Sequence, residues 1–312
     1  MWLSGALDTG TARTPPGSSD ERRREHANPS VEANEGDQFL QPRHGGSSSS
    51  CAGLFGWKGR RVTYVLILAC LLGGTVLQRL AGIGFGLFAS PLLVLALGPG
   101  PGVAAVVICG GGASVLLLVQ QWRAVEWRAS IPLAVGGAVG VVPGVAVHSL
   151  LPGGPLQVII GAVTLVLLGV VVLLHRFRRS EGESDRSHPL LASGITGITA
   201  GAINVIAGVG GVPLSVFAVL TRWRAAAFTA SSQFVFAVMC VATIAGLAAV
   251  GDLELPTFSA AQWVGAAAAI FIGVMMGPWL ARHTSHKTGR RIMLVTAGAG
   301  AFASLIKGMT ML

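Results

Sequence analysis

Two glycine-rich stretches, "QRLAGIGFGLFASPLLVLALG" at residues 78–98 and "NVIAGVGGVPLSVFAVL" at residues 204–220, decide how this chain folds. They share an AGxG core and a proline followed by leucine. The apolar run behind each glycine cluster is shorter than the roughly 20 residues of an ordinary membrane span. A short apolar run behind glycines, with an early proline, is typical of a broken or re-entrant membrane helix. The stretches therefore predict two related halves with one broken helix each.

The rest of the chain supplies membrane helices around these stretches. It is 52% hydrophobic and only 11% charged, whereas soluble domains carry about 25% charged residues. Apolar runs separated by short polar loops lie at 62–80, 84–98, 101–121, 130–151, 155–175, 190–208, 209–221, 225–250, 260–281 and 290–311. We therefore expect an all-α fold, a polytopic transmembrane helical bundle of two inverted repeats, with about eight to ten membrane segments that include the glycine-broken or re-entrant short helices.

Changes in composition divide the chain into four regions. Residues 1–57 are rich in Ser, Gly, Pro, Glu and Arg and lack apolar periodicity, which is typical of a disordered N-terminal tail. The polar stretch 176–189 separates two apolar parts of similar length and is interpreted as a cytoplasmic linker. Transmembrane repeat 1 is thus expected at 58–175 and transmembrane repeat 2 at 190–312.

Loop charges predict that the halves are inverted. Arg123 and Arg128 follow the third apolar run of the first half, whereas Asp252 and Glu254 follow the third run of the second. Because basic loops stay in the cytoplasm, opposite charges at equivalent loops indicate opposite orientation of the halves.

One basic cluster conflicts with a simple count of ten crossings. If the loop at 121–129 is cytoplasmic, ten crossings put the basic residues at 58–61 outside. A re-entrant hairpin at 81–100 would remove the conflict, because the first half would then cross the membrane only about four times. The number of crossings therefore stays open at this point.

Several function classes are disfavoured. The net charge of +9 does not indicate nucleic-acid binding, because the basic residues lie between apolar runs, as they do beside membrane spans. The four cysteines show no CxxC spacing, so we expect no metal and no cofactor. HExxH and GxSxG motifs are missing, so we expect no catalytic residues and no enzyme activity.

The first glycine cluster contains the most informative candidate residues. Arg79 is the only charged residue in the first three apolar runs, and an arginine at membrane depth usually faces a polar cavity or partner. We predict that Arg79, with Gln78, faces an anion; the alternative is a side chain that reaches the interface from a helix end. Gly82, Gly84 and Gly86 free backbone N–H groups and the positive end of the next helix for an anion, unless they only allow close helix packing.

The second half supplies a glycine cluster and uncharged hydrogen-bonding side chains. Such groups suit an oxyanion held by neutral dipoles, although Ser and Thr in membrane helices often bond their own backbone or a neighbouring helix. The residues predicted to bind substrate here are Asn204, Gly208, Gly210, Gly211, Ser231, Ser232 and Gln233.

Together these motifs resemble the TauE/SafE family of sulfite exporters and 4-toluene sulfonate uptake permeases, over about residues 62–310. The stretches that carry the resemblance are "LQRLAGIGFGLFASPLL" at 77–93, "NVIAGVGGVPLSVFAVLTRW" at 204–223 and "FTASSQFVF" at 228–236. The family motifs match Gln78, Gly82, Gly84, Gly86 and Pro91 in the first half and Gly208, Gly210, Gly211 and Pro213 in the second.

The resemblance implies a multi-pass permease of the bacterial inner membrane that moves sulfite, a sulfonate or a related anion by alternating access. Its partners would be the lipid bilayer and a small anionic substrate, with no nucleic acid and with homo-oligomerisation left open. The polar element that many members carry is replaced by "VAAVV" at 103–107. This departure implies an asymmetric site, with Arg79 on one side and Ser231, Ser232 and Gln233 on the other. The alternatives are a membrane scaffold or assembly protein that transports nothing, and an anion channel.

Overall fold

A computed structural model describes residues 49–82, 84–151, 153–177, 189–283 and 286–310. Most of the expected tail at 1–57 and of the expected linker at 176–189 lies outside these residues. Helix α1 begins at Ser49, so the end of the stretch assigned to the tail is helical. The described part of the chain contains helices and loops but no strand, which confirms the all-helical prediction.

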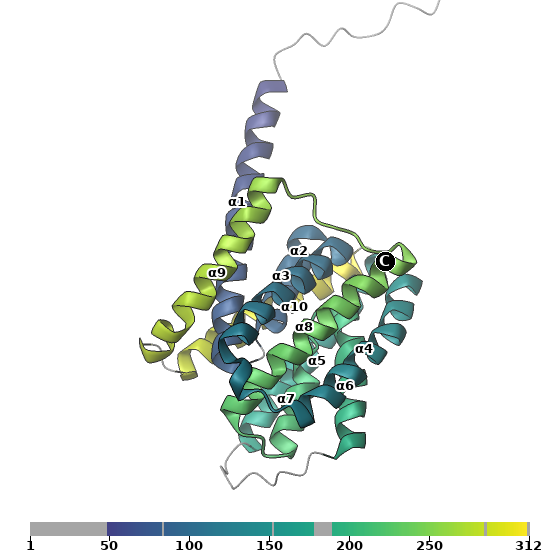
Figure 1. The fold of residues 1–312 in the computed structure, drawn as a ribbon. Helices are drawn as coiled ribbons and strands as arrows, with labels where there is room; N and C mark the ends of the chain where they lie inside the picture. Colours follow the sequence, from purple (N-terminus) through teal and green to yellow (C-terminus); the bar gives the residue numbers. More distant parts are fainter. Residues whose placement is uncertain (1–48, 83, 152, 178–188, 284–285, 311–312) are drawn as a thin grey trace, which may run out of the picture. The chain divides into compact units, whose positions relative to one another are not determined.

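The described residues form ten α-helices and one short 3-10 helix (Figure 1). Their bounds are α1 Ser49–Ala81, α2 Phe85–Leu97, α3 Pro99–Gln121, η1 Trp122–Ala124, α4 Trp127–Leu150, α5 Gly153–Phe177, α6 Leu190–Ala207, α7 Gly211–Leu220, α8 Ala225–Val250, α9 Ala260–His283 and α10 His286–Met309. Each expected apolar run corresponds to one of these helices.

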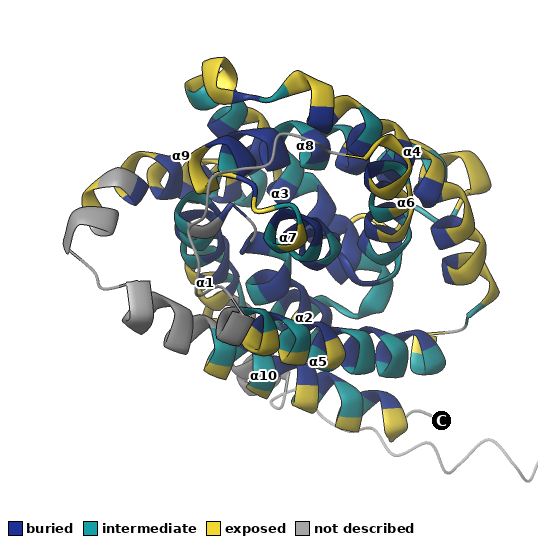
Figure 2. Cartoon of the chain, turned by 90° about the horizontal axis from the view of Figure 1, so that it is seen from below, coloured by how far each residue is buried: buried dark blue, intermediate teal, exposed yellow. Residues whose placement is uncertain are grey.

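Seven of the helices contain segments long and apolar enough to cross a membrane. These segments are Val62–Leu80, Pro99–Ala124, Trp127–Leu150, Gly153–Leu174, Leu190–Ala207, Ala225–Val250 and Ala260–Gly277. The apolar helices Phe85–Leu97 and Gly211–Leu220 are shorter, and the part of α10 whose side chains are described, Leu294–Met309, is apolar too. The first two are the helices that the glycine clusters predicted to be short. Large apolar side chains remain exposed on the outer faces of the helices (Figure 2), as they do on surfaces that contact lipid.

Helices α1 and α6 end with the same backbone conformation. Gly82 and Gly208 have φ angles of 75° and 67°, in the left-handed region that glycine adopts with little strain. The N–H of Gly82 donates to the carbonyl of Gln78 at 2.8 Å, and the N–H of Gly208 donates to the carbonyl of Asn204 at 2.9 Å. The short helices α2 and α7 begin directly afterwards, so both predicted helix breaks are confirmed.

Helices at equivalent places in the two halves have equivalent neighbours. The short helix α2 packs against α3 and α10, and the short helix α7 packs against α8 and α5. Helix α4 packs against α6, and α9 packs against α1, where Gly265 lies against Tyr64 and Gly273 against Thr75. The pairs α3–α8 and α5–α10 join one half to the other.

Contacts along these pairs give the direction of each helix. Helices α4 and α6 run parallel, because Gly136 lies against Gly194 while Gly144, further along, lies against Ala202. Helices α3 and α8 run antiparallel, because Gly111 contacts Cys240 while Glu126, just beyond α3, bonds Ser231 near the start of α8. The third helix of one half thus runs opposite to the third helix of the other.

The membrane-spanning part of α1 begins close to the acidic loop that joins α8 to α9. The hydroxyl of Tyr64 donates to the carbonyl of Gln262 at 2.7 Å. At the far end of α1, Arg79 bonds Gln120 near the end of α3. Helix α2 then turns back, since its Val94 lies against Gly102 at the start of α3. The start of α1 is therefore at the opposite end of the helices from the 121–129 loop. The re-entrant hairpin at 81–100 was expected to put both on the same side.

Candidate functional site

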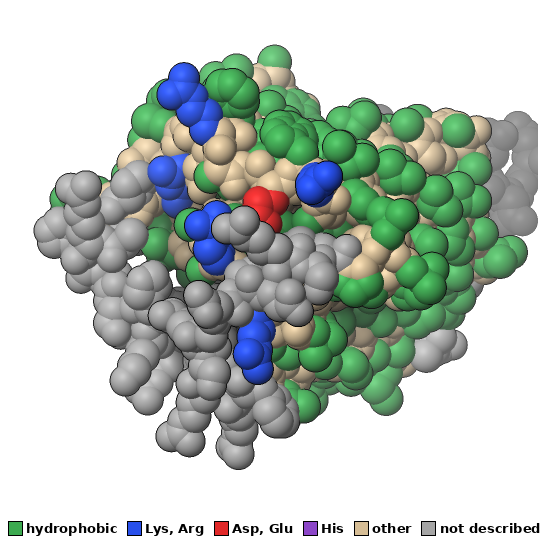
Figure 3. Space-filling model, turned by 60° about the horizontal axis from the view of Figure 1, so that its bottom comes forward, with side chains coloured by type: hydrophobic (Ala, Val, Ile, Leu, Met, Phe, Trp, Pro, Cys, Tyr) green, Lys and Arg blue, Asp and Glu red, His purple; other side chains and the backbone are tan. Residues whose placement is uncertain are grey.

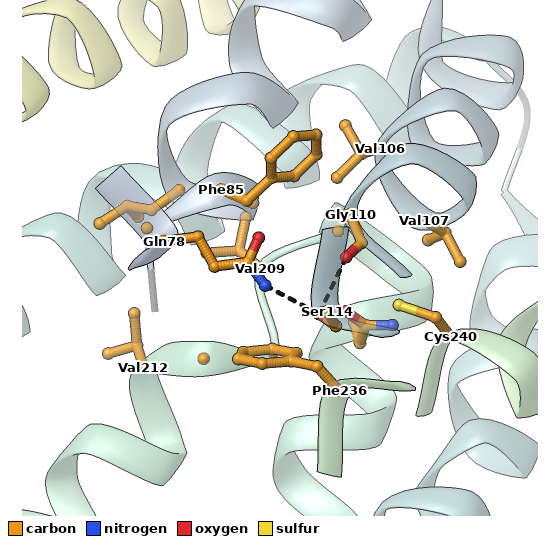
Figure 4. A pocket seen from close by; sticks show the side chains of 17 residues that line it. Gln78, Phe85, Val106, Val107, Gly110, Ser114, Val209, Val212, Phe236 and Cys240 are labelled. Atoms are coloured by element: carbon orange, nitrogen blue, oxygen red, sulfur yellow. Dashed lines mark hydrogen bonds between the residues drawn. The ribbon is translucent and has the colours of Figure 1, made fainter. Parts of the chain in front are cut away.

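A small cavity of about 30 Å³ lies where the two glycine breaks meet (Figure 4). It offers room for one or two water-sized groups. The first turns of α2 and α7, the middle of α3 and α8, and the ends of α1 and α6 form its walls. The lining residues are Gln78, Gly84, Phe85, Gly86, Leu87, Val106, Val107, Gly110, Ser114, Asn204, Gly208, Val209, Gly210, Gly211, Val212, Phe236 and Cys240.

Both short helices present their N-termini to this cavity. Gly84 precedes α2 and Gly210 precedes α7, and neither start has a side-chain cap. The first N–H groups of a helix have no partner within the helix, and they carry the positive end of its dipole. Among the described residues that line the cavity, none has a charged side chain. The cavity thus combines two positive helix ends with neutral walls, which suits an anion.

Glutamine and serine side chains form a hydrogen-bond network beside the first break. The Gln78 amide nitrogen donates to Ser114 Oγ at 2.7 Å and to Gln233 Oε1 at 2.8 Å. The Gln233 amide nitrogen donates to the carbonyl of Gly82 at 3.2 Å, and Ser232 Oγ donates to the same carbonyl at 3.0 Å. All five of these residues are buried. Helix α8 of the second half therefore holds the broken backbone of the first.

Close packing surrounds the second break, together with one hydrogen bond from the Ser90 hydroxyl of α2 to the carbonyl of Ala207. A Cβ atom at Gly86 would collide with the carbonyl oxygen of Gly208, so the two breaks approach each other backbone to backbone. A Cβ at Gly208 would lie 2.8 Å from a methyl carbon of Val106. Asn204 lines the cavity and donates from its amide nitrogen to Thr243 Oγ1 at 3.2 Å.

The predicted site residues fall into three groups. Those that line the cavity are Gln78, Gly84, Gly86, Asn204, Gly208, Gly210 and Gly211. Those that lie one layer behind it, around the Gly82 carbonyl, are Gly82, Ser232 and Gln233. Those that lie elsewhere are Arg79 and Ser231.

Arg79 points away from the cavity lining, toward α3 and α9. Its guanidinium donates to Gln120, and its aliphatic stem lies against Gly277 of α9. Ser231 accepts a hydrogen bond from the backbone N–H of Glu126 at 3.0 Å. The structure thus brings the neutral candidate residues other than Ser231 together, but neither Ser231 nor the predicted arginine is among them.

Ser114 and Phe236 line the cavity but were not among the predicted residues. Ser114 follows the glycine run 110–112 of α3, and glycines in a membrane helix signal close approach of a neighbour. This signal could have identified Ser114 as a polar group facing another helix. Nothing in the local sequence distinguishes Phe236 from the other apolar residues of α8.

Figure 3 shows Lys or Arg side chains around an acidic side chain on the face that comes forward from the bottom of Figure 1. Glu126 lies in the 121–129 loop. Trp223 Nε1 donates to one carboxylate oxygen of Glu126 at 2.7 Å. Arg224 lies 3.5 Å from the other oxygen, with its own side chain 74% exposed. Glu126 belongs to the first half and Trp223 to the second, so this cluster joins the halves at one end.

Comparison with known proteins identifies the family. None of the curated proteins and none of the solved structures compared with the chain gives a significant match. The sequence profile of one family, described as sulfite exporter TauE/SafE, matches residues 66–304, which is most of the chain and includes both glycine breaks and every residue of the cavity wall. Since that family consists of multi-pass membrane transporters, the chain is a multi-pass membrane protein that belongs to the sulfite exporter TauE/SafE family.

Proposed function

We propose that this protein is a permease of the bacterial inner membrane that moves a small oxyanion of the sulfite class by alternating access. The cavity between the N-termini of α2 and α7 is the observation that carries this proposal. Its small volume and neutral walls favour a compact anion over an aryl sulfonate. The family profile, which is named for sulfite export, supports the same class of substrate.

Neutral dipoles supply the binding energy at such a site. Each helix N-terminus stabilises a nearby negative charge by about 0.3–1 kcal/mol when exposed and by up to about 2 kcal/mol in partly buried geometries. Two such ends meet at the cavity, beside Ser114 and Asn204. A site without a fixed cation also releases its anion readily, because no ion pair has to be broken.

The helix arrangement supports two inverted repeats as the moving parts. Equivalent helices have equivalent neighbours, and the third helices α3 and α8 run in opposite directions. In inverted-repeat transporters the substrate sits where the repeats meet, and one repeat rocks against the other. The cavity touches α1–α3 of the first half and α6–α8 of the second, so relative movement of the halves would open it to one face at a time.

Arg79 has a distinct proposed role beside this site. It follows Gln78 directly in sequence and is only partly buried, and its guanidinium bonds an uncharged partner, Gln120. We propose that its positive charge attracts the anion toward the cavity without contacting the bound ion. Arg79→Ala should then lower the apparent affinity for transport while the protein still inserts and folds.

Transport by purified protein in liposomes tests the proposal. Labelled sulfite should enter protein-containing liposomes faster than empty ones, at a rate that saturates with sulfite concentration. No uptake above that of empty liposomes would favour the scaffold alternative. A conductance in planar bilayers too high for a carrier cycle would favour the channel alternative. If Arg79→Ala moved sulfite with the same apparent affinity as the wild type, the role given to Arg79 would be wrong.

The substrate class can be narrowed by thermal unfolding of the protein in detergent. A ligand that binds only the folded state raises its apparent stability by mass action. Sulfite should stabilise the protein more than sulfoacetate or toluene sulfonate, because the small cavity leaves less room for their additional carboxymethyl or aryl groups. Greater stabilisation by an aryl sulfonate would contradict the proposed size limit.

A further inference from the structure

The orientation of the Gln78 amide follows from its neighbours. The Gln233 amide group lies against the backbone carbonyls of Gly82 and Thr229, at 3.2 Å from each. Carbonyls only accept hydrogen bonds, so Gln233 must turn its nitrogen to them and its oxygen to Gln78. Gln78 must then present its nitrogen to Gln233 and to Ser114, whose own hydroxyl proton goes to the carbonyl of Gly110 at 2.9 Å.

This arrangement leaves the Gln78 carbonyl oxygen as an acceptor without a donor. Gln78 is only 3% exposed, and its Oε1 atom is buried and has no hydrogen-bond partner in the described structure. Gln78 lines the cavity, and Figure 4 shows its amide between the rings of Phe85 and Phe236, with the oxygen turned away from Ser114. A buried acceptor of this kind is costly unless a ligand or water donates to it.

A ligand that satisfies the whole cavity must therefore do two things. Its negatively charged oxygens must accept hydrogen bonds from the N–H groups at the starts of α2 and α7. It must also donate one hydrogen bond to Gln78 Oε1. A fully deprotonated oxyanion can only accept hydrogen bonds, so it meets the first requirement but not the second. An oxyanion that keeps one proton, such as hydrogen sulfite in its O–H form, meets both.

Resting on the proposed function, we infer that the cavity selects the singly protonated monoanion, with the substrate O–H donating to Gln78 Oε1. Each transported anion then carries one proton across the membrane with it. This explains how proton movement and sulfite movement would be coupled although no Asp, Glu or His lies among the described cavity residues. Gln78 becomes the residue that distinguishes protonation states.

Few other groups near Gln78 titrate. Arg79 lies next to it on α1, and thiols lie on α3 at Cys109 and on α8 at Cys240. The described side chains of α2, α3, α7 and α8, and those of α9 up to Gly277, include no Asp, Glu, Lys or His. Arginine and cysteine ordinarily ionise at higher pH than hydrogen sulfite does. A pH dependence that appears with sulfite alone is therefore a property of the substrate.

Chlorate is the matched control ligand, because it is a pyramidal monoanion like hydrogen sulfite but carries no proton. Purified full-length protein in detergent is titrated with each anion by thermal unfolding, without oxygen, across the pH range in which hydrogen sulfite loses its proton. The apparent affinity for total sulfite should fall as pH rises, in proportion to the remaining hydrogen sulfite. Chlorate should bind about tenfold more weakly, because the Gln78 oxygen stays without a donor, and its affinity should not change with pH.

Two variants assign the preference to the Gln78 oxygen. Gln78→Met removes the carbonyl and should make the affinities for hydrogen sulfite and chlorate converge. Ser114→Ala disturbs the same network but keeps the oxygen, so it should preserve the ratio of the two affinities even if both fall. If Gln78→Met did not fold, Ser114→Ala and the wild-type comparison with chlorate would still decide the question.

Each outcome separates the two proposals. Equal wild-type affinities for chlorate and hydrogen sulfite would overturn the selection of the protonated form, as would tighter sulfite binding at higher pH or an unchanged ratio in Gln78→Met. The proposed function would survive all three results. Absence of any stabilisation by either anion would instead overturn the proposed function and, with it, this inference.

Discussion

The two glycine breaks share one backbone geometry but have different surroundings. At the first break, the carbonyl of Gly82 accepts hydrogen bonds from Ser232 and Gln233 of α8. At the second break, Val106 of α3 covers Gly208 with a methyl group. Helices α3 and α8 are the third helices of their halves. Ser232 and Gln233 of α8 are polar, whereas Val106, the residue of α3 at the other break, is apolar. The first break is thus held by side-chain hydrogen bonds from α8, whereas the second is held by packing against α3 and by a hydrogen bond from Ser90 of α2 to the carbonyl of Ala207.

This difference places the polar side of the cavity at the first break. The apolar "VAAVV" element at 103–107 supplies Val106 and Val107 to the cavity wall, so side-chain hydrogen bonding comes mainly from Gln78 and Ser114. The asymmetric site was expected to have Arg79 on one side and Ser231, Ser232 and Gln233 on the other, whereas the polar side chains that line the cavity are Gln78, Ser114 and Asn204. Two breaks with the same backbone geometry can in this way have different side chains around them.

A substitution that forces the two breaks apart should lower the stability of the protein the most. In Gly86→Ala the new Cβ would meet the backbone carbonyl of Gly208, which cannot move aside as a side chain can. We expect a loss of stability at the upper end of overpacking costs, about 3 kcal/mol, measured by thermal unfolding in detergent. Gly112→Ala is the control, because no atom lies within 4 Å of its Cβ position. Equal melting temperatures for the two variants would contradict the backbone contact.

Disrupting the polar support of the first break should have the next largest effect. Gln233→Leu removes one donor to the Gly82 carbonyl and the acceptor of the Gln78 amide. Leaving buried polar groups without partners costs about 1–3 kcal/mol. Since the two glutamines share one network, Gln233→Leu and Gln78→Leu together should cost less than the sum of the single changes. Strictly additive unfolding free energies would show that the glutamines act independently.

A change at the second break should be smaller and partly reversible. Gly208→Ala forces alanine into a left-handed conformation, at a cost of about 1–2 kcal/mol, and its Cβ would press on Val106 at 2.8 Å. Val106→Ala should relieve the contact but not the backbone strain, so the double variant should regain part of the lost melting temperature. The equivalent Gly82→Ala meets the backbone of Thr229 at 3.1 Å and should gain nothing from Val106→Ala. Rescue of both glycine variants would mean that the breaks do not differ in this way.

The smallest effect is expected outside the breaks, at the exposed pair between Arg224 and Glu126. Arg224→Gln should change the unfolding free energy by less than about 1 kcal/mol, because exposed ion pairs are weak and screened by salt. Trp223→Phe removes the shorter bond to Glu126, 2.7 Å long, and should cost more. A larger loss with Arg224→Gln than with Trp223→Phe would mean that surface charge, and not the buried bond, joins the halves at this end.

Local features of the sequence sufficed to predict the breaks but not every side chain around them. A glycine that ends a helix in the left-handed region acts through its own backbone, so Gly82 and Gly208 were predictable from their position before a short apolar run. The direction of Arg79 was not. Neighbouring residues of an α-helix point about 100° apart, and only the contact with Gly277 of α9 determines that Gln78, and not Arg79, faces the cavity.

Tertiary packing also determined which polar residues line the cavity and which support it. Ser232 and Gln233 were predicted to bind substrate, yet they bond the carbonyl of Gly82. Ser114 has the same polar character and lines the cavity because α3 crosses α1 at Gln78. The residue types therefore predicted polar side chains beside the breaks together with the charge of Arg79, while the distances between α1, α3 and α8 decided the role of each member.

The position of a bound anion tests the central claim most directly. Selenite has the shape and charge of sulfite, and its selenium can be located by anomalous scattering in crystals of the protein. We predict one selenium site inside the membrane segments, between the first turns of α2 and α7 and beside Gln78 and Ser114. A selenium site next to Arg79 on the α9 side, with none between the two helix N-termini, would contradict it.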